Sequence, residues 1–191
     1  MQELYISVDI EADGPIPGPN SMLSLGAVAL LEDGREVGAF EVNFETLEGA
    51  QGDPETMAWW SKQPREVWEH IRKAALAPAV GMAAFVSWVN QRANDQKLSP
   101  VCVAYPAGFD FTFVYWYIRR FGLKSPFSFS CLDIKSYAAA TLKVPYRQAV
   151  KKNMPKSWFE GLPPHTHKGL DDAREQGQLF LNIRKHRHGQ P

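Results

Sequence analysis

Two acidic side chains lie where the sequence predicts a buried strand. Asp9 and Glu11 close a run of apolar and β-branched residues that begins at Leu4. Residues i and i+2 of a strand point to the same face, so both carboxylates would meet on one side of a sheet. Two like charges near a buried face are costly unless a cation neutralises them. The pair alone fits a metal site and a short strand followed by a solvated loop equally well.

Two further carboxylates and a histidine occur later in the chain. Asp110 follows the apolar run at 101–105 and a Pro-Ala-Gly turn, and Asp172 comes five residues after His167 at the start of a predicted helix. Taken singly, Asp110 is best explained as a helix N-cap and His167 as a solvated loop residue. Taken together, the four carboxylates form an all-oxygen set that suits Mg²⁺ or Mn²⁺. A histidine that does not ligate could act as a base toward the attacking water.

Hydrophobic periodicity and turn signals predict the elements that would position these side chains. Three strands come first, at 3–10, 22–31 and 35–45, with a hairpin turn at 32–34. Helices are predicted at 54–62 with Asp53 as N-cap, and at 64–75, 79–95, 111–122, 132–142 and 169–187, with a fourth strand at 101–105. Residues 143–168 have no clean period and indicate mainly loop. This order of elements predicts a mixed α/β sheet with helices packed against it.

Length and composition favour one domain over residues 1–191, because 45% of the residues are apolar and a sizeable core is available. The first residues are strand-like, without a basic leader, and no apolar run approaches the length of a membrane span. We therefore expect a cytoplasmic protein with no membrane partner. Cys102 and Cys131 lie in apolar contexts without metal-site spacing, so both are expected to be buried free thiols.

Charge is unevenly distributed along a chain whose formal net charge is zero. Residues 1–60 hold twelve Asp/Glu and one Lys/Arg, and residues 61–191 hold nine and twenty, so the two parts carry −11 and +11. An acidic focus beside a basic surface would give this pattern, and so would solvated charges that mix in three dimensions. The absence of a basic excess argues against tracking of long duplex DNA.

The order and spacing of the acidic motifs resemble those of the DEDDh 3′-5′ exonucleases, the DnaQ-like group with an RNase H-like fold. The matching motifs span nearly the whole chain and are Asp9-x-Glu11, Asp110 and His167-x4-Asp172. The small stand-alone exoribonucleases of the Rv2179c-like type are most similar, since they have a Trp-Trp pair like that at 59–60. Two positions differ from proofreading members: Ala12-Asp13 stands in place of Thr-Thr, and Tyr105-Pro106 in place of His-Asn.

This resemblance implies an RNase H-like mixed central sheet flanked by helices, with strands 1–3 as an antiparallel meander and later strands parallel to the first. It implies two Mg²⁺ or Mn²⁺ ions held by Asp9, Glu11, Asp110 and Asp172, with Asp9 bridging, and His167 as the base. His165 lacks the x4 spacing to Asp172 and is expected to contribute little. The substrate contacts expected from it are Ala12, Asp13, Trp59, Trp60, Lys151 and Lys152.

Two of these substrate assignments have structural alternatives. Adjacent helical residues point about 100° apart, so at most one of Trp59 and Trp60 is expected to face a nucleotide while the other packs in the core. The segment from Lys143 to Lys156 holds five basic and no acidic residues. It is consistent with a mobile phosphate-contacting loop and with a solvated basic loop.

The activity that the resemblance implies is metal-dependent release of nucleoside 5′-monophosphates from the 3′ end of single-stranded nucleic acid, with RNA ahead of DNA. The alternatives are an RNase H-type endonuclease, a phosphodiesterase acting on small nucleotides, and a non-catalytic nucleic-acid-binding module. The last is the least favoured, because four converging acids without a metal would oppose phosphate binding. The expected partners are single-stranded RNA or DNA 3′ ends, and the sequence leaves a homodimer open.

Overall fold

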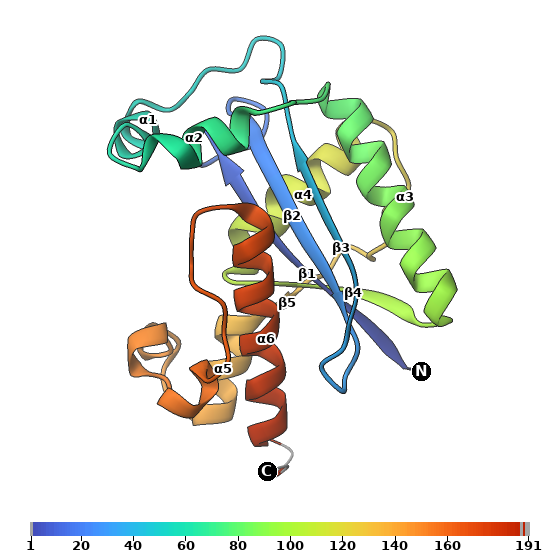
Figure 1. The fold of residues 1–191 in the computed structure, drawn as a ribbon, viewed down its shortest axis with the longest axis vertical. Helices are drawn as coiled ribbons and strands as arrows, with labels where there is room; N and C mark the ends of the chain where they lie inside the picture. The colour runs from blue at the N-terminus through green and yellow to red at the C-terminus, as the bar shows by residue number, and fades with distance from the viewer. Residues whose placement is uncertain (1, 188, 190–191) are drawn as a thin grey trace.

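A mixed sheet forms the centre of the computed structural model, which describes residues 2–187 and 189 (Figure 1). The antiparallel meander consists of β1 (Glu3–Ala12), β2 (Met22–Leu30) and β3 (Glu36–Asn43). The shorter strands β4 (Ser99–Ala104) and β5 (Leu132–Asp133) continue the sheet parallel to β1, in the order β3-β2-β1-β4-β5. Both the meander and the parallel later strands are as predicted.

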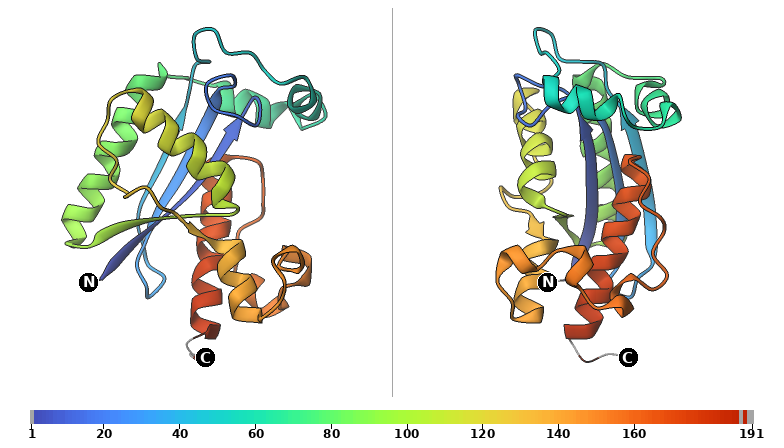
Figure 2. Two further views of the ribbon diagram at one scale, coloured as in Figure 1. Left: turned by 180° about the vertical axis from the view of Figure 1, so that it is seen from behind. Right: turned by 90° about the vertical axis from the view of Figure 1, so that its left-hand side faces the viewer.

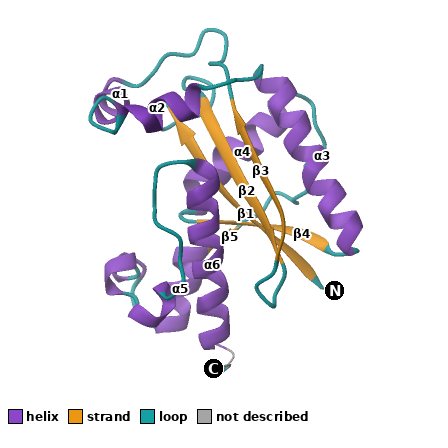
Figure 3. Ribbon diagram, viewed as in Figure 1, coloured by secondary structure: helices purple, strands orange, loops and turns teal. Residues whose placement is uncertain are grey.

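Helices cover both faces of this sheet. The helices are α1 (Pro54–Trp60), α2 (Arg65–Arg72), α3 (Pro78–Gln96), α4 (Ala107–Arg120), α5 (Ile134–Leu142) and α6 (Gly169–Arg187). Figure 2 shows α3 and α4 on one face and α6 on the other. Figure 3 shows how the strands lie between them. Among the described residues, no helix has the length and apolar character needed to cross a bilayer.

Alternation along β1 divides its side chains between two cores. Leu4, Ile6 and Val8 belong to the core beneath α3 and α4, whereas Tyr5 belongs to the core beneath α6. Because side chains alternate in a strand, Asp9 and Glu11 share the face of Tyr5 and lie under α6. The sheet therefore directs both carboxylates toward the last helix.

Several element boundaries differ from the sequence prediction in ways that affect the site. β1 continues to Ala12, so Glu11 belongs to the strand and not to the following loop. Helix α4 begins at Ala107, and Asp110 lies inside its first turn instead of capping it. Residues 132–133 form β5 where a helix was predicted, and Asp133 is the N-cap of α5.

The segment predicted as mainly loop has more order than expected. It contains three short 3-10 helices, at Tyr146–Gln148, Lys151–Asn153 and Lys156–Phe159. The Trp158 side chain is 1% exposed and packs in the core beneath α6. Trp158 therefore anchors this segment to the core. Cys102 is buried as predicted, but Cys131 is half-buried.

The start of α6 is seated directly on the backbone of β2. A Cβ atom at Gly26 would overlap the carbonyl carbon of Gly169 and the amide nitrogen of Leu170. A Cβ at Gly169 would in turn lie 2.8 Å from the Gly26 nitrogen. Two glycines therefore allow the first turn of α6, which carries Asp172, to approach the strand next to β1.

We expect Gly26→Ala to destabilise the fold by about 1–3 kcal/mol or more, because backbone atoms on both sides of the contact leave no flexible side chain to yield. Urea unfolding would measure the loss. Gly108→Ala is the matched control, since nothing lies within 4 Å of its added methyl group. A Gly26→Ala protein as stable as this control would contradict the close packing of α6 on β2.

Candidate active site

The edge of β1 becomes free of its strand neighbour just before the acidic residues. The pairing of β1 with β4 ends at Ser7. Beyond it, the Ile10 amide donates to Asp110 Oδ1 at 3.2 Å, and Gln176 Nε2 donates to the Val8 carbonyl at 2.7 Å. Side chains from α4 and α6 thus replace the missing strand, which brings both helices to the part of β1 that carries the carboxylates.

Three of the four predicted metal ligands converge at this edge. Asp9, Glu11 and Asp172 each offer a carboxylate oxygen, and these oxygens lie within 4.8 Å of one another. Asp110 lies outside that set but close enough for its charge to act on Asp9 and Glu11. Asp110 and Asp172 are 3% and 2% exposed, whereas Asp9 and Glu11 keep more exposed surface.

This arrangement raises the pKa of every carboxylate in the group. Burial is the main cause for Asp9 and Glu11, and the charges of neighbouring carboxylates add to it. Burial also raises the pKa of Asp110 to about 7. The pKa of Asp172 is raised by burial against the opposing effect of its hydrogen bonds. An oxygen-only set that resists ionisation without a counter-ion fits a hard divalent cation such as Mg²⁺ or Mn²⁺.

In EDTA, the metal-free protein is expected to become less stable as the pH rises from about 4, the ordinary carboxyl pKa, to about 7. In this window the folded state binds more protons than the unfolded state, so the free energy of unfolding falls with rising pH. Urea unfolding at several pH values would measure the slope. Asp110→Asn should flatten it, because the amide oxygen can still accept the bond from Ile10 but cannot ionise.

Adding Mn²⁺ at pH 8 should reverse part of this loss, since a cation that binds the folded state stabilises it by mass action. The midpoint of thermal unfolding would report the effect. An Asp9→Asn protein should respond less to Mn²⁺ than the unaltered chain. Equal responses from the two proteins would place the bound ion elsewhere.

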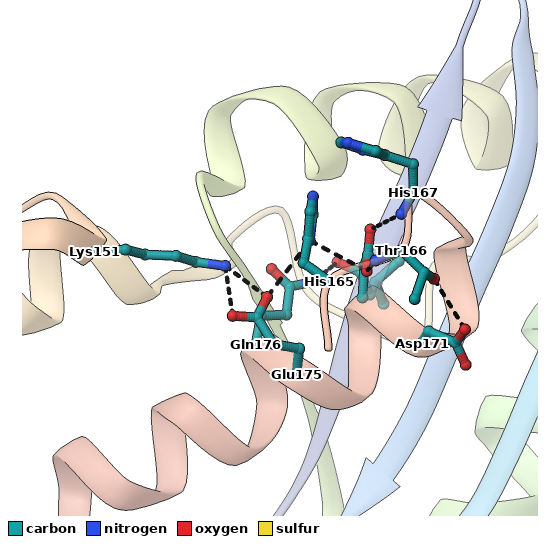
Figure 4. A network of polar contacts seen from close by, with 9 residues as sticks. Lys151, His165, Thr166, His167, Asp171, Glu175 and Gln176 are labelled. Atoms are coloured by element: carbon teal, nitrogen blue, oxygen red, sulfur yellow. Dashed lines mark hydrogen bonds and ion pairs between the residues drawn. The ribbon is translucent and has the colours of Figure 1, made fainter. Parts of the chain in front are cut away.

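The segment before α6 places Thr166 and His167 beside the first turn of that helix (Figure 4), and both residues bind Asp172 through their backbone amides. Thr166 N donates to Asp172 Oδ1 at 2.8 Å, and His167 N donates to Oδ2 at 2.9 Å. His167 has a left-handed backbone, with φ of 58°, which turns the chain into the helix. The backbone amide of His167, not its ring, therefore orients the carboxylate.

The imidazole of His167 packs against two other rings. It lies edge-on to the Trp59 ring at 5.1 Å and to the His165 ring at 4.5 Å between centroids. Burial, and then the charge of His165, lower the pKa of His167. A half-buried imidazole with a lowered pKa, next to a group of carboxylates, has the properties of a general base.

The predicted substrate residues are distributed over different environments. Ala12 and Trp60 are buried, and Trp60 Nε1 donates to the Ala12 carbonyl at 2.9 Å. Asp13 is also buried, and its carboxylate accepts from Ser21 N. Of the tryptophan pair, Trp59 is accessible, with 39% of its surface exposed next to His167.

The two lysines predicted to contact the substrate, Lys151 and Lys152, also differ in their surroundings. Lys151 Nζ lies 2.7 and 2.5 Å from the two carboxylate oxygens of Glu175, and 5.5 Å from the centre of the Tyr105 ring. Lys152 is exposed. Lys151 therefore lies at the edge of the site, where it forms an ion pair with Glu175.

Near the carboxylates, Gln176 and Glu175 were not predicted, and His165 was predicted to contribute little. Gln176 supports β1 at Val8, and Glu175 is 7% exposed and holds Lys151. His165 Nδ1 lies 3.1 Å from Asp172 Oδ1 and 3.7 Å from Glu175 Oε2. Glu175 could have been identified from its spacing, since residues i and i+3 share a helix face with Asp172.

Known proteins match both the sequence and the fold of this chain. The family model described as the 3′-5′ exoribonuclease Rv2179c-like domain matches residues 5–184. The 3′-5′ DNA exonuclease Cap18 of Escherichia coli is 30% identical over 189 residues, which cover 96% of this chain and 93% of Cap18.

Solved structures share the fold at low sequence identity. The nuclease domain of 3′hExo, a DEDDh family member bound to rAMP, has a TM-score of 0.73 at 15% identity and covers 98% of this chain and 94% of its own. Escherichia coli exonuclease I in complex with a dT13 oligonucleotide has a TM-score of 0.66 at 14% identity, over 98% of this chain and 43% of its own. The chain therefore belongs to the 3′-5′ exoribonuclease Rv2179c-like domain family and is a 3′-5′ exonuclease of the DEDDh type.

Proposed function

We propose that the protein releases nucleoside 5′-monophosphates one at a time from the 3′ end of single-stranded nucleic acid, with RNA preferred to DNA. The observation that carries this proposal is the convergence of Asp9, Glu11 and Asp172 at the free edge of β1, with the His167 imidazole beside them. The preference for RNA rests on the description of the family as exoribonucleases. DNA is the second candidate, because the relative with 30% identity is named a DNA exonuclease.

Each residue of the site has a distinct role in this proposal. Asp9, Glu11, Asp110 and Asp172 would hold two Mg²⁺ or Mn²⁺ ions. When bound, such ions stabilise negative charge on the attacking and leaving oxygens of a phosphodiester. His167 accepts the proton of the attacking water, a contribution of typically about 10²–10⁴-fold. The Thr166 and His167 amides keep Asp172 oriented while this happens.

The substrate strand would be held by contacts outside the carboxylate group. Trp59 is exposed beside His167, where it can stack on a terminal base, a contact worth about 1–3 kcal/mol per base. Lys152 and Lys151 would face the phosphates of the strand. Ala12 and Asp13 would act through the backbone that they shape, since both side chains are buried.

A product ladder from end-labelled substrates is the decisive experiment. In Mg²⁺ or Mn²⁺, a labelled RNA strand should shorten one nucleotide at a time from its 3′ end, faster than the matched DNA strand and faster than a blunt duplex. A 3′-phosphate should slow the reaction strongly. Faster shortening of the DNA strand would overturn the proposed preference for RNA but would still support 3′-5′ exonuclease activity.

Two other outcomes would favour the alternative activities. Cleavage of a circular single strand would identify an RNase H-type endonuclease, since a circle has no end. Hydrolysis confined to dinucleotides would identify a small-nucleotide phosphodiesterase. A cytoplasmic location, a homodimer and a single domain over residues 1–191 stay predictions, which cell fractionation, sedimentation and limited proteolysis can test.

A further inference from the structure

A second group of metal-ligating atoms shares Asp172 with the carboxylate site. His165, His167 and Asp172 each offer one such atom, and the three atoms lie within 4.8 Å of one another. The two imidazoles are neighbours, with 4.5 Å between their ring centroids (Figure 4). The group contains two nitrogen donors, whereas Asp9 and Glu11, which form the other group with Asp172, offer oxygen alone.

This difference in donors changes the preferred cation. Mg²⁺ and Mn²⁺ favour oxygen ligands, whereas two imidazoles and one carboxylate suit Zn²⁺. Zn²⁺ with bonds of about 2.0–2.1 Å in a tetrahedron places its ligand atoms about 3.3 Å apart. His165 Nδ1 and Asp172 Oδ1 are already 3.1 Å apart. The side chain of His165 is 48% exposed, so a rotation that closes the remaining distance meets little packing.

The charges around the group also favour a cation. Glu175 Oε2 lies 3.7 Å from His165 Nδ1, which adds a second carboxylate to that of Asp172. Lys151 neutralises part of this charge through its ion pair with Glu175. Asp9 and Glu11, whose carboxylate oxygens lie within 4.8 Å of an Asp172 oxygen, add two more acidic groups to the surroundings.

We propose that His165, His167 and Asp172 form a Zn²⁺ site that is distinct in its donors from the carboxylate site. Zn²⁺ held there would occupy the His167 nitrogen that the reaction needs as a base. The site would therefore make the enzyme sensitive to inhibition by Zn²⁺ in the presence of Mn²⁺, a consequence that rests on the proposed role of His167.

Binding can be tested without measuring hydrolysis. Calorimetric titration of Zn²⁺ into an Asp9→Asn protein examines the histidine group after the oxygen-only group has been weakened. We expect one Zn²⁺ to bind, and His165→Gln in the same background to weaken binding about tenfold or more. Glutamine can still donate to Asp172 but has no imidazole nitrogen, so a loss of affinity reports ligation and not the loss of that hydrogen bond.

The matched control is a histidine that pairs with a carboxylate elsewhere. His70 Nε2 lies 2.9 Å from Glu41 Oε1, and His70→Gln should leave Zn²⁺ affinity unchanged. Co²⁺ absorption provides a second readout, since tetrahedral nitrogen ligation should give intense visible bands that His165→Gln removes. Zn²⁺ binding that Asp9→Asn abolishes, or that His165→Gln leaves intact, would overturn the site.

The inhibitory consequence has its own test. In Mn²⁺-supported hydrolysis by the otherwise unaltered chain, His165→Gln should raise the Zn²⁺ concentration needed for half-inhibition about tenfold. Zn²⁺ binding without this shift would retain the metal site and reject the role of His167 as the base. If neither the unaltered chain nor His165→Gln hydrolyses any strand, the proposed function is rejected. The result of the Zn²⁺ titration is independent of that outcome.

Discussion

Asp9→Asn is expected to abolish hydrolysis in a protein that stays folded. Asp9 lies on a strand buried between two cores, and asparagine has nearly the same shape, so packing should be kept. Burial, and then the charges of Asp110, Glu11 and Asp172, raise the pKa of the Asp9 carboxyl. Removing one charge relieves repulsion in the metal-free protein but leaves the cation with fewer negative ligands. Turnover should fall by about 10³-fold or more, as expected when electrostatic stabilisation of a phosphoryl transition state is lost.

Steady-state kinetics at saturating Mn²⁺ would measure the loss of turnover. Urea unfolding in EDTA would measure the effect of the relieved charge repulsion on stability. Stability in EDTA should be unchanged or slightly higher. Asp33→Asn is the control, because Asp33 is an exposed aspartate paired with Arg35. Asp172→Asn should also be inactive, but Asp172 accepts two backbone amides, so an amide group there costs stability as well. Unchanged turnover in Asp9→Asn would sink the two-metal mechanism.

His167→Ala should lower kcat by about 10²-fold or more while the affinity for Mn²⁺ changes little. Its backbone amide orients Asp172 and survives the substitution, whereas the ring that we propose as the proton acceptor is lost. His167 has a φ of 58°, which alanine tolerates poorly, so His167→Asn is the second variant. Asparagine favours this backbone but cannot act as a base, and both variants should be slow.

The pH profile distinguishes a base from a structural residue. The base must be neutral, so the rate should fall as the pH drops through the pKa of His167, which burial places below its ordinary value of about 6.5. This acid limb should be missing from the residual activity of His167→Asn. A variant that retains full kcat, or the same acid limb, would show that another group accepts the proton.

The sequence was most informative where a local pattern determines the geometry. Strand periodicity predicted that Asp9 and Glu11 share a face, and helix signals located the start of α6 before Asp172. Both predictions depend on residues close together in the chain. The meander could be predicted for the same reason, because its strands are long and separated by clear turns.

Features that depend on distant residues could not be predicted. The two-residue strand β5 exists because it pairs with β4, and its own sequence continues the helical pattern of α5. The Ile10 amide donates a hydrogen bond to the Asp110 carboxylate, 100 residues away in the chain. Asp110 therefore binds the edge of β1 instead of capping its own helix. The contact between His165 Nδ1 and Asp172 Oδ1 joins residues close in the chain, but it depends on the path of a loop without a sequence period. The expectation that His165 contributes little to hydrolysis stays a prediction.

The position of α6 in the chain also determines when the enzyme becomes active during its own synthesis. Chains emerge from the ribosome N-terminus first, and β1 through α5 precede the helix that carries Asp172. Until Gly169 can pack against Gly26, the carboxylate group lacks one of its members, and the histidine next to Asp172 has no fixed position. A nascent chain therefore lacks the complete carboxylate group until residues 169–187 have been synthesised and packed on the sheet.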